Sequence, residues 1–172
     1  MSLLDAPAYD EAKAKRNQAI LISTVVSIFL LLVIGWFVSG RPVDWPWNWG
    51  NHLLGRAAVN HFLEAVEKND LETAYGIWIH DKDWKQHLDQ HKTYPFSRFQ
   101  GDWSSTSPDN EYGVIQSHRI AAARMYGNSL LMAILVNGRK SKALSLEYDP
   151  HDHTLSFAPP DVEINPESYS SN

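Results

Sequence analysis

The feature that most constrains this chain is an uninterrupted apolar run, Ile20 to Val38, whose only polar side chains belong to Ser23, Thr24 and Ser27. No charged residue lies between Arg16 and Arg41. A helix that rises 1.5 Å per residue over this stretch crosses roughly 30 Å of hydrocarbon. The run therefore predicts a single transmembrane helix over residues 19–39 and makes the lipid bilayer the first expected partner.

The basic residues around the run predict its orientation. Lys13, Lys15 and Arg16 precede it, whereas Arg41 is the only basic residue close behind it. By the positive-inside tendency, residues 1–18 form a cytoplasmic tail and the larger part of the chain lies outside the cytoplasm, in the periplasm if the cell is Gram-negative. A cleaved signal peptide is the alternative, but its apolar region is normally about 7–15 residues and precedes a small-x-small cleavage site. The longer run and the poor site that follows it favour an uncleaved anchor.

Residues 40–50 form a connector rich in tryptophan and proline. Pro42 and Pro46 interrupt helical structure and stiffen the chain. Indole rings bury their apolar surface and still hydrogen-bond through N–H in the headgroup region, so four tryptophans are predicted at the membrane interface. These are Trp36, Trp45, Trp47 and Trp49. Packing of these rings on the folded domain is the alternative.

The composition of the remaining chain excludes several functions. Residues 51–158 have the length of one domain with a single core. From Arg41 onward twelve Lys and Arg face seventeen Asp and Glu, a net charge of −5 with neutral histidines, which argues against a nucleic-acid partner. The chain has no cysteine, which removes disulfides and thiolate chemistry. No cofactor is expected, because dinucleotide and phosphate-loop glycine patterns are absent.

Helical periodicity dominates the first half of this domain. Residues 51–69 carry Leu54, Ala58, Phe62 and Ala65/Val66 at helical spacing, and Asp70 is placed to cap a second helix. In that second helix Leu71, Ala74, Tyr75 and Trp78 recur on one side. Residues 81–91 are predicted as a short third helix with Trp84 and Leu88 inward, and residues 92–110 as an irregular segment.

From Glu111 onward the spacing of the apolar residues changes from that of helices to that of strands. Extended segments are predicted at residues 112–126, 129–136, 142–148 and 153–157, separated by short turns such as Gly127-Asn128 and Asn137-Gly138. Such connections predict an antiparallel meander in which residues 129–136, apolar on both faces, form an interior strand. Residues 159–172, rich in proline and serine, are predicted to be a disordered tail. The fold class is thus α+β, with helices packed on a curved antiparallel sheet.

Residues 57–75, AAVNHFLEAVEKNDLETAY, carry a family resemblance. They resemble the opening pair of helices in the nuclear transport factor two-like superfamily, the SnoaL/cystatin-like cone, in which a short acidic turn leads to an Ala-Tyr start of the second helix. The resemblance implies a cone-like fold over about residues 51–157, and in enzymes of the superfamily an acid, base or tyrosine inside the cone. A cystatin-like helix on a sheet is the nearest alternative.

Candidate ligand-binding residues come from the first long strand and the second helix. Gln116, His118 and Arg124 are predicted on one strand face, with Arg119 on the other. Tyr75 and Trp78 are candidates to line a pocket, although helical spacing equally suits a core position. His118 is the residue best suited to be a general base, but a hydrogen-bonded sheet histidine is the favoured interpretation. No catalytic residue is assigned.

A metal site is not predicted. Asp83, His87 and His91 recur at i, i+4 and i+8, which on a helix separates the first and last by about 12 Å, too far for one ion. An Asp83–His87 surface pair is expected instead. His151-Asp152-His153 is expected to form a solvated hairpin tip.

Three functions are consistent with these patterns. The first is a membrane-tethered, non-enzymatic binding or assembly module of the cell envelope, whose partner is another envelope protein or a second copy of the chain. The second is an enzyme or small-ligand carrier that uses the cone interior. The third is an accessory subunit of a larger membrane complex.

Overall fold

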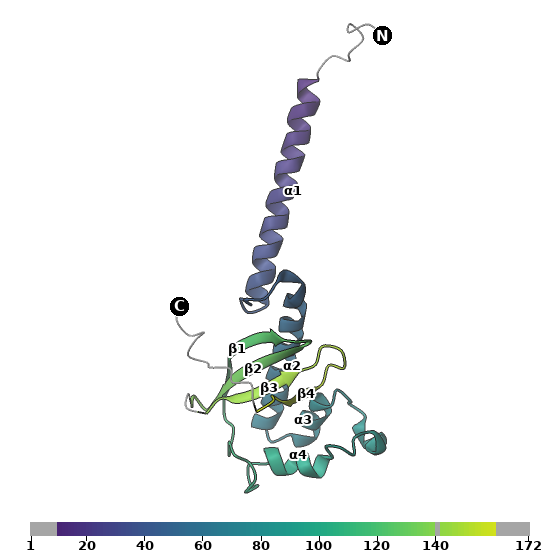
Figure 1. Cartoon of the computed structure of the whole chain (residues 1–172), viewed down its shortest axis with the longest axis vertical. Coiled ribbons are helices and arrows are strands. Elements are labelled where there is room, and N and C mark those ends of the chain that lie inside the picture. Colours follow the sequence, from purple (N-terminus) through teal and green to yellow (C-terminus); the bar gives the residue numbers. More distant parts are fainter. Residues whose placement is uncertain (1–9, 140–141, 161–172) are drawn as a thin grey trace.

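A computed structural model describes residues 10–139 and 142–160. A long helix projects from an α+β domain (Figure 1). The helices are α1 Glu11–Val38, α2 Trp49–Glu67, α3 Leu71–Trp78 and α4 Phe96–Trp103, with single 3-10 turns at η2 Pro46–Asn48, η3 Trp84–Gln86 and η4 Leu88–Gln90. The strands are β1 His118–Tyr126, β2 Ser129–Val136, β3 Leu144–Tyr148 and β4 Leu155–Phe157.

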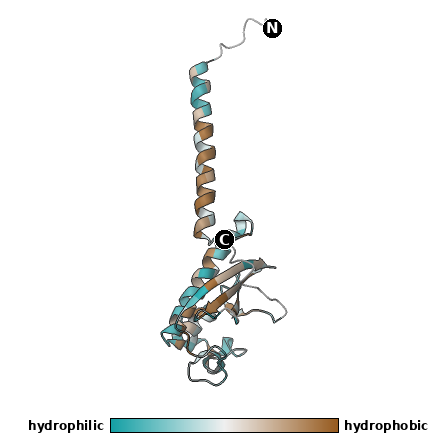
Figure 2. Cartoon of the chain, turned by 90° about the vertical axis from the view of Figure 1, so that its left-hand side faces the viewer, coloured by the Kyte–Doolittle hydropathy of each residue, from teal (hydrophilic) through white to brown (hydrophobic). Residues whose placement is uncertain are grey.

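Helix α1 is long and apolar enough to cross a membrane by length and composition. Asp10 caps its first turn by accepting a hydrogen bond from the Lys13 N–H at 3.0 Å. None of its residues is buried by the domain, and its apolar surface begins beyond a polar first part (Figure 2). Residues 11–18 of the predicted tail are part of this helix, and the predicted span 19–39 ends one residue beyond it. Residues 1–9 lie outside the described part of the chain.

The predicted connector, residues 40–50, is shorter than expected, because α2 already begins at Trp49. Hydrogen bonds fold it tightly between the two helices. The Trp36 indole N–H donates to the Pro42 carbonyl at 3.0 Å, and the Trp49 indole N–H donates to the Asp44 carbonyl at 3.0 Å. Helix α1 therefore enters the domain through a hydrogen-bonded turn.

Helices α2 and α3 form the predicted pair. Asn69 takes a positive φ of 57° at the turn, and the Asp70 carboxylate caps α3 by accepting from the Thr73 N–H at 3.1 Å. The buried face of α2 includes Phe62, as predicted, but Leu54 is 50% exposed. At that level Gly55 faces the sheet instead, where a methyl group would lie 2.7 Å from Leu130 Cδ2.

The segment between α3 and the sheet differs from prediction. Residues 81–91 form two 3-10 turns instead of a third helix, and Leu88 is exposed. Part of the segment expected to be irregular forms α4, which begins after Pro95 and buries Phe99 and Trp103. A proline at a helix start removes no intrahelical hydrogen bond, so Pro95 marks the beginning of α4.

The sheet is an antiparallel meander in the order β1-β2-β3-β4, which confirms the predicted interior position of β2. The predicted strand 112–126 begins only at His118, and the predicted strands 142–148 and 153–157 begin at Leu144 and Leu155. Asn137 and Gly138 both take positive φ values, of 52° and 70°, as their tight turn requires.

The core lies between the helices and one face of the sheet. Helix α2 crosses the sheet, while α3 and α4 lie toward one end of it (Figure 1). Aromatic rings dominate the centre: Phe62 packs edge-on against Trp103 with ring centroids 4.7 Å apart. On the opposite sheet face Ala122, Leu131 and Ala133 form a smaller buried cluster. The predicted tail, residues 159–172, falls mostly outside the described residues.

Candidate functional site

The site with the clearest binding geometry is a cleft between the end of α3 and the edge strand β4, which lie side by side (Figure 1). Its volume of about 410 Å³ is in the range of small ligand pockets. We call it the α3–β4 cleft. Its lining consists of Trp78, Ile79, His91, Tyr94 and residues 154–157.

Aromatic rings form the floor of the α3–β4 cleft. The Phe157 ring lies 5.1 Å from the Trp78 ring and stacks on Trp103 with centroids 5.6 Å apart. Trp78 and Trp103 are buried, whereas Phe157 is 44% exposed at the edge of the sheet. The cleft thus opens the aromatic core to the surface beside β4.

The main chain of β4 adds hydrogen-bonding capacity to this edge. The Asp149 N–H donates to the Thr154 carbonyl, and the Ala158 N–H donates to the Ser145 carbonyl. Since hydrogen-bonded pairs alternate in an antiparallel ladder, Leu155 and Phe157 point their peptide groups away from β3. An exposed sheet edge of this kind is suited to pair with an extended segment.

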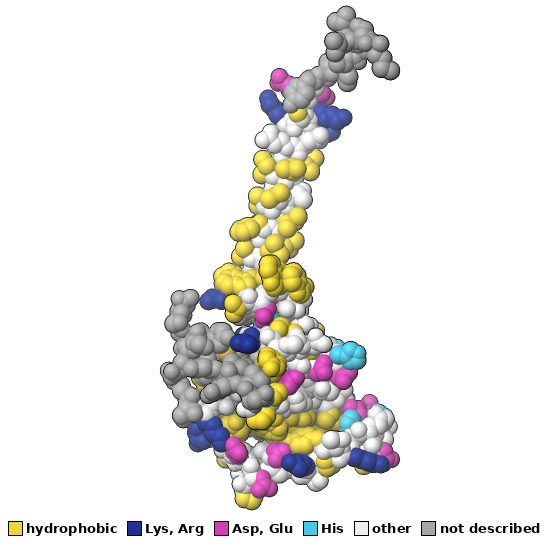
Figure 3. Space-filling model, viewed as in Figure 1, with side chains coloured by type: hydrophobic (Ala, Val, Ile, Leu, Met, Phe, Trp, Pro, Cys, Tyr) yellow, Lys and Arg dark blue, Asp and Glu magenta, His cyan; other side chains and the backbone are white. Residues whose placement is uncertain are grey.

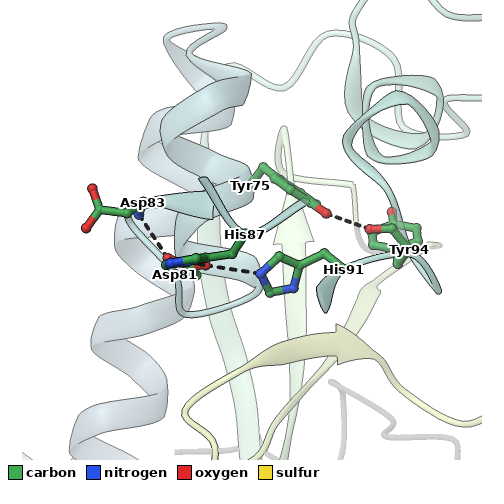
Figure 4. A network of polar contacts seen from close by, with 6 residues as sticks. All are labelled: Tyr75, Asp81, Asp83, His87, His91 and Tyr94. Atoms are coloured by element: carbon green, nitrogen blue, oxygen red, sulfur yellow. Dashed lines mark hydrogen bonds and ion pairs between the residues drawn. The ribbon is translucent and has the colours of Figure 1, made fainter. Parts of the chain in front are cut away.

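Two tyrosines fix one wall of the α3–β4 cleft (Figure 4). The Tyr75 hydroxyl donates to the Tyr94 carbonyl at 2.7 Å, and the Tyr94 hydroxyl donates to Asp102 Oδ2 at 2.6 Å. Burial, assisted by the Asp102 carboxylate, raises the pKa of Tyr94 far above its usual range, and burial raises the pKa of Tyr75. Both phenols therefore remain protonated at neutral pH and act as structural donors.

A polar network built around Asp81 adjoins the cleft through His91, which lines it (Figure 4). Its Oδ2 lies 2.8 Å from His87 Nδ1 and 3.1 Å from His91 Nε2, while its Oδ1 accepts from the Asp83 N–H at 2.9 Å. Hydrogen bonding lowers the pKa of Asp81, and the largest cause is the hydrogen bond with His87. The expected Asp83–His87 pair is wrong, because 3-10 turns bring both histidines to Asp81. Within the described residues, no group of three or more potential ligands is arranged to hold a metal ion.

His118 lies where the sheet meets α2. Its Nδ1 is 2.7 Å from Glu67 Oε1 and its Nε2 is 3.2 Å from Asn60 Oδ1. Both ring nitrogens are thus occupied by side chains of one helix. Gln116 is exposed before β1, and its peptide N–H donates to Asn137 Oδ1 at 2.8 Å.

Arg124 does not share a face with His118, contrary to the prediction. A bulge between Ile120 and Ala122 shifts the register of β1. Beyond this bulge Arg124 pairs with Leu131, which belongs to the cluster on the face away from the helices. One extra residue in a strand reverses the alternation of all the residues after it.

The predicted residues Tyr75 and Trp78 come together in the aromatic core, and Trp78 also lines the α3–β4 cleft. Neither is placed with His118 or Arg124 in one pocket. His91 and Phe157 also line the cleft, although neither was predicted from the sequence as a site residue. An aromatic residue on a short terminal strand close to proline is the only local signal for Phe157.

The four predicted interface tryptophans divide into two pairs. Trp36 and Trp49 bind the connector through their indole N–H groups, and the Trp49 ring packs near Gly35. Trp45 and Trp47 stack on each other and remain largely exposed.

A larger groove of about 810 Å³ runs between α2, α3 and η3. Side chains of both charges line it, and Lys85 pairs with Glu72 across it at 2.6 Å. Exposed, mutually neutralising charges of this kind are well solvated. The groove therefore offers less for recognition than the apolar α3–β4 cleft.

The chain matches no protein-family model, no curated protein and no solved structure.

Proposed function

We propose that this protein is a membrane-tethered, non-enzymatic binding or assembly module of the cell envelope. The observation that carries the proposal is the α3–β4 cleft, which is apolar and lies beside the edge strand β4 in a domain joined to an apolar helix by a hydrogen-bonded turn. A partner that inserts an apolar side chain into this hollow would be held close to the bilayer.

The proposed topology places residues 1–18 in the cytoplasm and the domain outside it. Lys13, Lys15 and Arg16 at one end of α1 support this orientation against the single Arg41 at the other. A reporter fused after Asn172 that is active only outside the cytoplasm tests it. Activity of a cytoplasm-only reporter at the same position would reverse the orientation.

Kinship with the nuclear transport factor two-like superfamily remains part of the proposal. The α2–α3 pair followed by an antiparallel sheet supports it. The early strand that this superfamily usually places among its helices has no counterpart before β1 in the described residues.

Recognition, as opposed to catalysis, is favoured by the environment of the candidate groups. His118 is engaged by Glu67 and Asn60, and the Tyr94 phenol is held protonated beside Asp102. A small apolar ligand is the second candidate occupant, because the volume of the cleft suits one.

Site-specific photocrosslinking in intact cells tests the proposal. A photoreactive phenylalanine analogue replaces Ser156, which lines the cleft, and in a control it replaces the exposed Gln100 of α4. We expect a crosslinked protein at position 156 that is absent at position 100. Native mass spectrometry of the full chain, extracted gently from its membrane, then separates the candidates. A retained small molecule on a monomer without crosslinks would replace the assembly role by ligand carriage.

A further inference from the structure

An exposed apolar surface lies at the junction of α1 with the domain, and we infer that it lies in the headgroup region of the bilayer. We call it the membrane-end patch; it consists of Val43, Trp45 and Trp47. Their exposed fractions are 81%, 68% and 73%. The inference rests on the proposed membrane tether and adds that the domain docks on the lipid surface.

The two tryptophans of the patch are arranged for an external contact. Their rings stack with centroids 5.1 Å apart and an interplanar angle of 3°, so they present one broad apolar surface. In contrast, Trp78, Trp84 and Trp103 are buried in the core. Within the described residues no hydrogen bond engages the indole N–H of Trp45 or Trp47, which leaves both free for headgroup oxygens.

The patch is held next to the end of α1. It begins five residues after Val38, and the bond from Trp36 to the Pro42 carbonyl fixes its start. The bond from Trp49 to the Asp44 carbonyl fixes its middle. If α1 crosses the bilayer, the patch is therefore at the level where the hydrocarbon ends. Figure 3 shows that hydrophobic side chains gather where α1 meets the domain.

The charges around the patch match a phosphate layer. Asp44 is the only acidic residue between Glu11 and Glu64. Its carboxylate is turned into the domain, where it contacts His52 at 2.6 Å and accepts from the Met125 N–H at 3.1 Å. The Arg41 guanidinium, in contrast, lies at the surface, 5.0 Å above the Phe37 ring. Exposed aromatic rings beside an outward cation are suited to lipid headgroups.

The absence of cysteine permits a clean test by single nitroxide labels. The full chain carrying Val43→Cys is labelled and reconstituted in phosphatidylcholine vesicles. Two further variants serve as controls, Ile28→Cys in the middle of α1 and Ser105→Cys in the exposed loop after α4. Accessibility is measured to oxygen, which partitions into lipid, and to a water-soluble nickel chelate.

We compare the ratio of oxygen accessibility to nickel-chelate accessibility at each label. We expect this ratio to be severalfold higher at position 43 than at position 105, and lower at position 43 than at position 28. Equal behaviour of positions 43 and 105 would overturn the docking, as would protection of position 43 from both reagents, which indicates a protein contact. Water access at position 28 would instead overturn the membrane span and thereby the proposed function.

A variant pair tests the role of the rings. Trp45→Ser combined with Trp47→Ser should lower the ratio of oxygen accessibility to nickel-chelate accessibility at position 43 toward the value measured at position 105. Leu88→Ser, which removes an exposed apolar side chain outside the patch, should leave it unchanged. Circular dichroism and the unfolding midpoint verify that the variants remain folded. An unchanged label in the double variant would refute the contribution of the two tryptophans.

Discussion

The Asp44 carboxylate lies 2.6 Å from the His52 imidazole, joining the segment after α1 to the first turns of α2. The His52 side chain is fully buried, and this burial lowers its pKa more than the neighbouring Asp44 raises it. The imidazole is therefore neutral near pH 7 and donates its Nε2–H. Because Asp44 also accepts from the Met125 N–H in β1, one carboxylate connects three parts of the fold.

Asp44→Ala should destabilise the domain. It leaves the His52 Nε2–H and the Met125 N–H without their acceptor, at a cost of about 1–3 kcal/mol for each buried group. Urea unfolding of the full chain in detergent micelles measures the loss. Asp89→Ala, which removes a highly exposed carboxylate, is the control and should change stability little. Equal effects of the two variants would contradict this role of Asp44.

The His52 imidazole predicts a pH dependence of stability. Its folded pKa is below its unfolded value of 6.5, so the unfolded chain binds more protons below that pH. The stabilising contribution is present above pH 6.5 and is lost as the pH falls through the window below it, by at most about 1.4 kcal/mol per pH unit. Unfolding free energies at pH 7.5 and 5.5 measure it. His52→Gln should reduce the difference, whereas His61→Gln, at an exposed position, should preserve it.

The sequence predicted elements whose signals are local. Helices α2 and α3 follow from apolar residues at helical spacing and from the Asp70 cap, and β2 follows from its apolar run. The prediction of a helix at residues 81–91 was wrong. The spacing of Trp84 and Leu88 suits a helix, but side-chain hydrogen bonds to Asp81 stabilise 3-10 turns there instead.

The candidate site was harder to predict, because it depends on register and on distant contacts. Ile120, Ala121, Ala122 and Ala123 are consecutive apolar residues, so no alternation of polarity reveals the bulge that separates His118 from Arg124. Glu67 and His118 are far apart in sequence, and no local pattern predicts their contact. The same holds for Trp78 and Phe157 at the α3–β4 cleft.

Gly55→Ala should destabilise the domain where α2 crosses the sheet. The new methyl group would lie 2.7 Å from Leu130 Cδ2 and 2.9 Å from Tyr148 Cδ1, so these buried side chains or α2 itself must shift, at a cost of about 1–3 kcal/mol. Gly50→Ala, in the first turn of the same helix, meets no atom within 4 Å and should be neutral or slightly stabilising. Thermal unfolding of both variants distinguishes close packing from helix propensity. A Gly55→Ala variant as stable as Gly50→Ala would show that the neighbouring groups move aside at little cost in free energy.

Leu31→Arg should impair membrane insertion. Leu31 lies in the middle of the apolar part of α1, where an arginine costs about 2.5–3.5 kcal/mol of insertion free energy. Asn17→Arg, in the polar first part of the same helix, should insert normally. The fraction of each variant that resists alkaline extraction from membranes measures insertion. Equal extraction of the two variants would argue against a transmembrane α1.

Phe62→Ala and Phe157→Ala should separate folding from binding. Phe62 is fully buried against Trp103, Trp78 and Phe99, so its removal should cost about 3–5 kcal/mol and weaken every function together. Phe157 is partly exposed and covers Trp78 and Trp103 from the side of the cleft, so its removal should cost less stability while changing the shape of the hollow. Unfolding midpoints together with crosslinking yields from position 156 measure both effects. If Phe157→Ala retained the full crosslinking yield, the partner would bind elsewhere, because the Phe157 ring is part of the floor of the α3–β4 cleft.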